Sequence, residues 1–210
     1  MARQGILVIL SGPSGTGKGT ICKELMKNYP NLHYSVSATT RSPRPGEING
    51  VNYWFVSEDV FIDMRANDEL LEWAEVYGRF YGTPRKYVSE LLASGKDVIL
   101  EIDIQGAMQV KDKFPQGVFV FIVPPSINEL ETRIHKRGTE TQDLIELRLS
   151  CVYQELSLIY NYQYVVVNDE VPAAVKKIAA IVEAEKCLVS RNKQIVDEIT
   201  GRQITQKEVD

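Results

Sequence analysis

The chain has 210 residues, 44% of them hydrophobic, which is enough to bury a sizeable core in one domain. Its 28 acidic and 24 basic residues give a formal net charge of −4, which argues against a nucleic-acid partner because such surfaces carry a basic excess. The three cysteines and two histidines are scattered, so we expect neither a disulfide framework nor a zinc site.

The first predicted element is an apolar strand over residues 6–10. Five residues are too few for a secretory leader or a membrane span, so we expect a cytoplasmic protein with no membrane partner. Residues 12–20 follow directly and read Gly-Pro-Ser-Gly-Thr-Gly-Lys-Gly-Thr, and a helical sequence begins at Ile21. A strand, a glycine-rich loop and a helix in this order predict a loop that binds a nucleoside triphosphate.

The composition of this loop has a chemical reason. Glycines let consecutive backbone N–H groups turn toward a polyphosphate, the helix N-terminus adds positive partial charge, and Lys18 can reach the outer phosphates. Most such loops carry Ser or Thr at position 19 as a magnesium ligand, but here Gly19 is followed by the hydroxyl of Thr20, which is our candidate Mg²⁺ ligand. The predicted phosphate-binding residues of the loop are Gly12, Pro13, Ser14, Gly15, Thr16, Gly17, Lys18, Gly19 and Thr20.

Residues 35–83 have a different texture, with clustered aromatic side chains and turn signals between short alternating segments. This pattern predicts a small, mostly antiparallel insert. Arg41 and Arg44 stand three residues apart beside Pro43, and Tyr53 follows. Guanidinium groups bind phosphate oxygens in a bidentate manner, so we predict a second phosphate site here rather than a solvated basic turn.

Continuous apolar runs recur at residues 98–100, 118–123 and 164–167, as expected for strands of a parallel sheet that is covered on both faces. Helices are predicted between them. Thr83 reads as a cap with Pro84 at the first helical position, residues 126–129 form a capping box, and Pro172 opens the last helix. The alternation predicts an α/β fold with right-handed crossovers.

Polar residues mark two strand ends. Glu101 and Asp103 follow one apolar run, and carboxylates at the carboxyl end of a strand commonly help to hold Mg²⁺, often through water. Asn168 follows another run, and either a turn or cap role or a contact with the adenine edge is open for it.

Several longer segments resemble guanylate kinases, and the resemblance spans roughly residues 5–185. The segments are residues 35–47, 49–53, 72–74, 81–83, 101–106, 137–140 and 168–169. The resemblance implies a three-layer P-loop α/β fold with a central parallel sheet, a small mixed α/β insert that binds GMP, and a helical lid. It implies one domain over residues 1–188, with the core at 1–34, 84–134 and 158–188, the insert at 35–83 and the lid at 135–157, followed by a C-terminal extension at 189–210.

The family resemblance further implies ATP-dependent phosphorylation of GMP, and of dGMP, to GDP with Mg²⁺, by direct in-line transfer in purine nucleotide metabolism. The implied GMP-binding residues are Ser37, Arg41, Arg44, Tyr53, Glu72, Tyr81, Gly82, Thr83, Glu101 and Asp103. On the ATP side the implied residues are Arg133, Arg137 and Asn168 together with the loop, and the implied catalytic residues are Lys18, Arg41, Arg137 and Arg148. Asp103 is our second candidate for Mg²⁺, through a water. The family includes monomers and homo-oligomers, and the sequence does not decide between them.

The chemistry of guanine independently favours a role for Glu72. Guanine presents N1–H and an amino group on one edge, and one carboxylate can accept from both, whereas adenine has a lone pair at N1. Two other readings are a guanylate-kinase-like binding module without catalysis and a kinase for a different monophosphate. The intact loop with Lys18 disfavours the first reading, and Glu72 disfavours the second.

Overall fold

A five-stranded parallel sheet in the order β2-β7-β1-β8-β9 forms the centre of the protein. The computed structural model describes residues 4–136 and 142–201, and the side chains of residues 4–135 and 149–201. The strands are β1 (Leu7–Ser11), β2 (Leu32–Tyr34), β7 (Asp97–Glu101), β8 (Val118–Val123) and β9 (Tyr164–Val167). In the centre of the sheet Val8 lies beside Ile99 on β7 and Val118 on β8.

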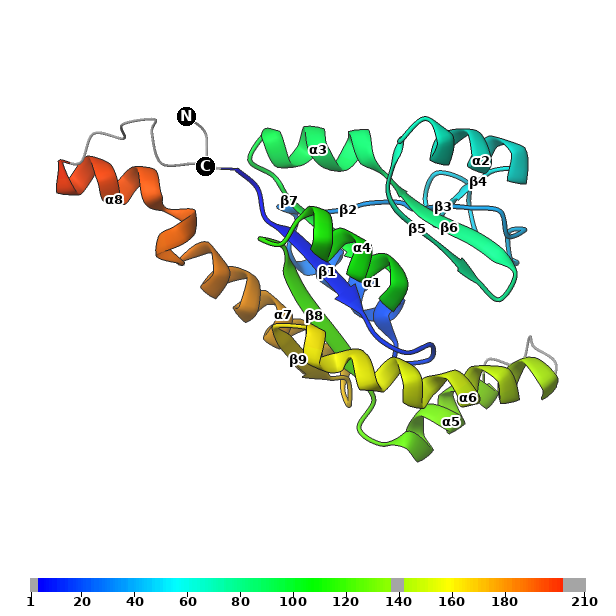
Figure 1. Cartoon of the computed structure of the whole chain (residues 1–210). Helices are drawn as coiled ribbons and strands as arrows, with labels where there is room; N and C mark the ends of the chain where they lie inside the picture. The colour runs from blue at the N-terminus through cyan, green and yellow to red at the C-terminus, as the bar shows by residue number, and fades with distance from the viewer. Residues whose placement is uncertain (1–3, 137–141, 202–210) are drawn as a thin grey trace.

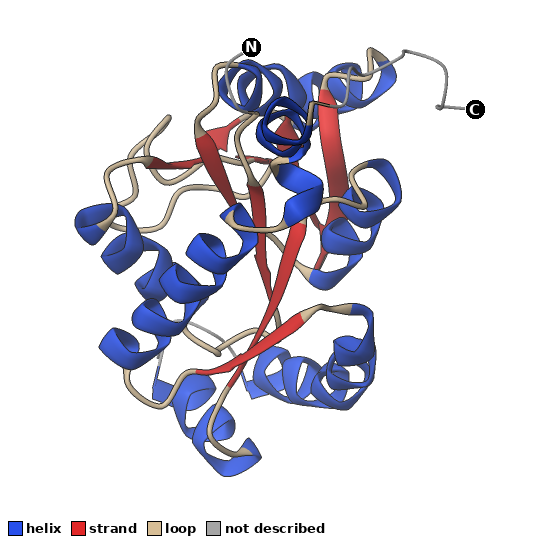
Figure 2. Cartoon of the chain, turned by 90° about the vertical axis from the view of Figure 1, so that its left-hand side faces the viewer, coloured by secondary structure: helices blue, strands red, loops and turns tan. Residues whose placement is uncertain are grey.

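Helices cover both faces of this sheet, as Figure 2 shows. Val8 and Leu10 pack with α1 (Lys18–Asn28) and α7 (Val171–Lys186), whereas Leu7 and Ile9 pack with α3 (Arg85–Ala93) and α4 (Ile104–Lys113). Because successive side chains of a strand point to opposite faces, the central strands β1, β7 and β8 contribute to both cores, whereas the edge strands β2 and β9 contribute only to the first. The predicted α/β fold with a covered parallel sheet is therefore confirmed.

A second, four-stranded sheet in the order β4-β3-β6-β5 lies within the predicted insert. Its elements are β3 (Ala38–Thr39), β4 (Trp54–Phe55), α2 (Glu58–Ala66), β5 (Leu70–Val76) and β6 (Arg79–Pro84). The β3–β6 and β5–β6 pairs are antiparallel and the β3–β4 pair is parallel. Tyr77 and Gly78, with φ of 50° and 70°, join β5 to β6, and their positive φ angles suit a tight hairpin turn. This unit has a small core of its own around Ala38, Phe61 and Leu70.

Two helices, α5 (Ile127–Lys136) and α6 (Gln142–Ser157), pack on each other through Leu130, Ile134 and Val152. A short 3₁₀ helix, η1 (Leu158–Asn161), leads from α6 to β9. In Figure 1 the second sheet lies to the upper right of the parallel sheet, and the α5–α6 pair lies to its lower right. This arrangement leaves the loop after β1 between them.

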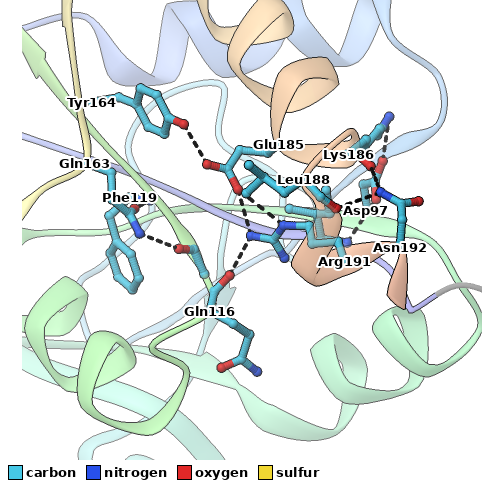
Figure 3. A network of polar contacts seen from close by, with 12 residues as sticks. Asp97, Gln116, Phe119, Gln163, Tyr164, Glu185, Lys186, Leu188, Arg191 and Asn192 are labelled. Carbon is cyan, nitrogen blue, oxygen red and sulfur yellow. Dashed lines mark hydrogen bonds and ion pairs between the residues drawn. The ribbon is translucent and has the colours of Figure 1, made fainter. Parts of the chain in front are cut away.

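The chain continues past α7 into η2 (Val189–Arg191) and α8 (Lys193–Thr200), and α8 projects at the opposite end of the molecule in Figure 1. A polar network joins this extension to the core, as Figure 3 shows. Arg191 Nη2 lies 2.9 Å from Glu185 Oε2 and donates to the Gln116 carbonyl at 2.7 Å, while the Tyr164 hydroxyl donates to Glu185 Oε1 at 2.6 Å. In the part of the chain that the structure describes, each helix is too short or too polar to cross a bilayer.

One predicted helix start needs correction, and one predicted capping box is only half formed. Helix α3 has Pro84 as its N-cap, and Thr83 belongs to β6 with its hydroxyl directed to a carboxylate rather than to the helix. The hydrogen bond from the Thr83 hydroxyl to the buried carboxylate of Glu72 is stronger than a cap hydrogen bond from an exposed backbone N–H of α3 would be. The box at residues 126–129 is half formed: Ser126 Oγ accepts from the Glu129 N–H at 3.1 Å, but the Glu129 carboxylate accepts from Arg133 instead.

Candidate active site

The glycine-rich loop leaves β1 through a conformation that requires glycine. Gly12 has φ of 141°, and a Cβ there would lie 2.2 Å from the Ile122 carbonyl oxygen. Gly17, with φ of 88°, is the N-cap of α1, so the first N–H groups of that helix open onto the loop. Such N–H groups, together with the helix dipole, form an anion-binding site.

Lys18 is folded over the loop that precedes it. Its Nζ donates to the carbonyl of Gly12 at 2.6 Å and to that of Pro13 at 3.1 Å. The ammonium group therefore lies against the loop itself.

Asn168, directly after β9, hydrogen-bonds the glycine-rich loop. Its side-chain Nδ2 donates to the Thr16 carbonyl at 2.7 Å, and its backbone carbonyl accepts from Arg133 Nη1 on α5 at 3.0 Å. Asn168 is buried, and a Cβ at Gly17 would lie 2.5 Å from its Nδ2. The sequence left open a turn or cap role and a contact with adenine for Asn168. The structure shows a different contact, the hydrogen bond to the Thr16 carbonyl.

One cavity joins the loop to the second sheet. Predicted residues line it from three directions: the loop, the second sheet with the segment before it, and the strand-end pair. They are Gly12, Ser14, Gly15, Gly17, Lys18, Gly19, Ser37, Arg44, Tyr53, Glu72, Tyr81, Glu101 and Asp103. The remaining described ones are outside this lining: Pro13, Thr16, Thr20, Arg41, Gly82, Thr83, Arg133 and Asn168.

Glu72 is a buried carboxylate on β5, with only 2% of its surface exposed. It lies opposite Thr83 in the antiparallel register, and the Thr83 hydroxyl donates to Oε1 at 2.6 Å. Burial is the main cause that raises the pKa of Glu72 to about 7, and the charge of Asp103 adds to it, whereas the Thr83 hydrogen bond opposes it. Helix α4 comes close at Gly106, where a Cβ would lie 2.2 Å from Glu72 Oε2.

The strand-end pair splits into two environments. Asp103 caps α4, accepting from the N–H of Gln105 at 2.9 Å and of Gly106 at 3.4 Å. Its pKa is raised overall by burial, although these backbone hydrogen bonds act to lower it. Glu101 lies beside the glycine-rich loop instead, because a Cβ at Gly19 would be 3.3 Å from its Oε1. Its Oε2 accepts from the Tyr34 hydroxyl at 3.3 Å.

This geometry can be compared with the needs of Mg²⁺. In the described ranges, no three His, Cys, Asp or Glu side chains come together as a metal-binding group. Mg²⁺ in phosphate-transfer sites is typically held by one or two carboxylates, with phosphate oxygens and water completing the shell. Glu101, next to the space left by Gly19, fits this need, whereas Thr20 is exposed and outside the cavity.

Arg41 is close to the cavity wall but is paired with a carboxylate. Its Nη1 and Nη2 each donate to Glu47 at 2.9 Å, and its guanidinium lies 5.3 Å from the Tyr53 ring centroid. Tyr53 and Tyr81 meet edge to face at 5.9 Å. Of the two predicted phosphate-binding arginines, Arg44 lines the cavity. Arg41 does not line it but packs against Tyr53, which does.

Two predicted arginines cannot be located. Arg137 lies outside the described residues, and Arg148 is in α6 but its side chain is outside those described. Sequence reasoning also missed Glu47, Tyr77 and Glu155, of which the last two line the cavity. Gly78 was a turn signal beside Tyr77, and Glu47 ends the segment 35–47 that resembles guanylate kinases, whereas nothing in the sequence distinguished Glu155 on α6.

Comparisons with known proteins agree on one family. The family model described as guanylate kinase matches residues 4–185. A curated guanylate kinase of Desulfitobacterium hafniense is 57% identical over 187 residues, covering 89% of this chain and 94% of the relative. Another, of Caldanaerobacter subterraneus, is 55% identical over 193 residues, covering 92% and 94%. The crystal structure of guanylate kinase from Anaplasma phagocytophilum superposes with a TM-score of 0.80 at 32% identity, covering 96% of this chain and 98% of that one.

Proposed function

This chain belongs to the guanylate kinase family, and on that premise we propose that it transfers the terminal phosphoryl group of ATP to GMP, giving ADP and GDP. The same reaction on dGMP is part of the proposal. The observation that carries it is a single cavity lined both by the glycine-rich loop with Lys18 and by the buried carboxylate of Glu72.

Glu72 supports guanine as the acceptor base. Its Oε1 already accepts from Thr83, and ionised carboxylate oxygens have further acceptor sites for the N1–H and amino group of guanine. Adenine would place a lone pair against this charge and leave a buried acceptor without a partner, which costs about 1–3 kcal/mol or more. Ser37, Thr83 and Asp103 are proposed to surround the base with it.

The acceptor phosphate is assigned to Arg44, Tyr53 and Tyr81, which line the cavity, with Arg41 behind them. The triphosphate of ATP is assigned to residues 12–20, and its outer phosphates to Lys18. Arg133 on α5, Arg148 on α6 and Arg137, which is outside the described residues, are proposed to approach the triphosphate, and Arg137 and Arg148 to stabilise the transferred group. Residues 35–83 and 135–157 would then be the acceptor-binding insert and the lid that close over the substrates.

The chemistry needs no base. The second pKa of a phosphate monoester is near 6, so the GMP phosphate is already largely ionised at neutral pH. One of its oxygens attacks the γ-phosphorus of ATP, and the bond to the bridging oxygen of ADP breaks in line with it. Lys18, the loop N–H groups and the arginines stabilise negative charge during this transfer. Closure excludes water, which would otherwise accept the phosphoryl group.

Glu101 is the proposed protein contact for Mg²⁺, directly or through water, and Asp103 is the second candidate, through water. When bound, Mg²⁺ would neutralise charge on the triphosphate oxygens. Thr20 stays a prediction that the geometry does not support, because its side chain is exposed and outside the cavity.

A coupled assay with ATP and GMP tests the proposal. We expect Mg²⁺-dependent formation of GDP, with AMP and dTMP turned over far more slowly. Lys18→Met should lower kcat by about 10²–10³-fold or more while the circular dichroism spectrum is retained. Comparable rates with GMP and AMP, or no turnover of GMP at all, would contradict the proposed function.

A further inference from the structure

Glu47 contacts both arginines that are assigned to the acceptor phosphate. Its Oε2 and Oε1 accept from Nη1 and Nη2 of Arg41, each at 2.9 Å, and Oε2 also accepts from the backbone N–H of Arg44 at 2.7 Å. The side chains of Arg41 and Glu47 are only 15% and 18% exposed. This carboxylate therefore links the side chain of one arginine to the backbone of the other.

The local backbone brings the carboxylate to this place. The Glu47 N–H donates to the Arg44 carbonyl at 3.0 Å, which closes a four-residue turn. Gly46 follows Pro45 with φ of 83°, a combination typical of a type II turn. Because Glu47 bonds Arg44 through both its backbone and its side chain, the loop between the two arginines is braced twice.

The pairing leaves part of Arg41 for another anion. A guanidinium has five N–H donors, and the Ser42 carbonyl takes one from Nη1 at 2.7 Å while Glu47 takes one from each η nitrogen. The two other donors, at Nε and Nη2, share one edge of the planar group. Tyr81 lines the cavity and also hydrogen-bonds Arg41, so these remaining donors are shared between the Tyr81 hydroxyl and an incoming anion, and the guanidinium lies within reach of the cavity.

The electrostatics keep the pair charged. Burial acts to raise the pKa of Glu47, but the hydrogen bonds from Arg41 and from the Arg44 backbone lower it overall. Burial acts to lower the pKa of Arg41, but the hydrogen bonds to Glu47 and Tyr81 raise it overall. Both groups therefore stay ionised across the neutral range.

We propose that Glu47 is a positioning residue for the acceptor phosphate: it fixes the guanidinium plane of Arg41 and the backbone of Arg44, so that both arginines meet the phosphate already oriented. A flexible arginine loses rotamer freedom when it binds, and a pre-oriented one loses less. The inference rests on the proposed function, since it needs a phosphorylated acceptor in this cavity.

The test compares Glu47→Gln and Glu47→Ala with Glu58→Gln. Glu58 is the matched control, because it pairs with Arg79 in the same unit at 3.8 Å while both side chains are more than half exposed. We expect Glu47→Gln to raise KM and Kd for GMP by about 10- to 100-fold, with a smaller change in kcat and none in KM for ATP. Guanosine has no phosphate, so its Kd by calorimetry should not change. The control should leave every value within about twofold.

A double-mutant cycle with Arg41→Ala gives the second readout. If Glu47 acts through Arg41, adding Glu47→Gln to Arg41→Ala should weaken GMP binding by no more than about twofold. The inference is overturned by an unchanged or lower Kd for GMP in Glu47→Gln, by an equal loss for guanosine, or by full additivity in the cycle. Glu47→Gln is nearly isosteric, and thermal unfolding shows whether it folds. A wild-type chain that fails to turn over GMP would instead overturn the proposed function.

Discussion

The Thr83 hydroxyl donates to Glu72 Oε1 at 2.6 Å across the antiparallel β5–β6 pair. This contact ties the protonation of a carboxylate with only 2% exposure to a hydroxyl on the neighbouring strand. Burial of this carboxylate raises its pKa and the Thr83 hydrogen bond opposes the shift, so the proposed guanine site should have a measurable pH dependence.

GMP binding should weaken as the pH falls below about 7. The pKa of Glu72 is raised to about 7, mainly by burial, and only the ionised carboxylate can accept from both guanine donors. We expect KM for GMP to rise about tenfold for each pH unit below that value, while KM for ATP does not follow this dependence. Thr83→Val removes a hydrogen bond that lowers the pKa, so the midpoint should move to higher pH. A KM for GMP that is flat between pH 5.5 and 8 would contradict this prediction.

Glu72→Gln should stabilise the ligand-free protein while it destroys guanine selectivity. A folded-state pKa above the unfolded value means that the carboxylate adds stability only while protonated, and this contribution is lost as the pH rises through about 7. The difference between the ordinary pKa of 4.5 and about 7 corresponds to roughly 3 kcal/mol. Urea unfolding at pH 8 should show the amide variant to be more stable by up to this amount, with the gain shrinking toward pH 4.5. Equal stability of the two proteins at pH 8 would refute the argument.

Asn168→Ala should weaken ATP binding without changing GMP binding. The side chain supports the glycine-rich loop through the Thr16 carbonyl at 2.7 Å and lies outside the cavity lining. Loss of one buried hydrogen bond leaves that carbonyl without this donor and should raise the Kd for ATP about 5- to 30-fold by calorimetry. Asn168→Asp should be worse, because it sets a carboxylate oxygen against the carbonyl. Equal losses for ATP and GMP would indicate a general folding defect instead.

Arg191→Ala should destabilise the fold by about 1–3 kcal/mol and leave kcat unchanged. The substitution leaves Glu185 with the hydrogen bond from the Tyr164 hydroxyl (Figure 3), and a buried carboxylate that loses a charged partner carries a desolvation cost. Glu185→Gln in the same chain should recover part of the loss, since it removes the unpaired charge. Urea unfolding of the two single variants and the double variant measures this, and a purely additive result would count against the pairing.

Much of the fold followed from patterns that are local in the chain. The apolar runs at residues 118–123 and 164–167 are β8 and β9 without change. β8 reads as a continuous apolar segment because it is covered on both faces, whereas the edge strand β9 leaves Val165 and Val167 exposed. The short edge strand β2 was missed, since His33 interrupts its apolar character. The Thr83 prediction failed because a hydroxyl that could cap a helix also faced a buried carboxylate eleven residues away. Sequence spacing does not contain that cross-strand contact.

The site was predicted most fully where its residues lie in one continuous segment. The loop from Gly12 to Gly19 forms one wall of the cavity as expected. The pairing of Arg41 with Glu47 was missed because Arg41 was assigned to a phosphate, and no pattern in the sequence marks Glu47 as its partner. Asn168 and Thr16 are 152 positions apart, and only the β8–β9 pairing brings the first beneath the second.

The second sheet has a core of its own around Ala38, Phe61 and Leu70, but Leu71 of β5 packs in one of the two cores of the parallel sheet. Substitutions in the first group can therefore reshape the second sheet with little effect on the packing beneath the glycine-rich loop, whereas a substitution at Leu71 affects both units. Under the proposed function, evolution or a protein engineer could change the nucleotide that this sheet selects and inherit the donor-binding loop intact, provided that the Leu71 contact is kept.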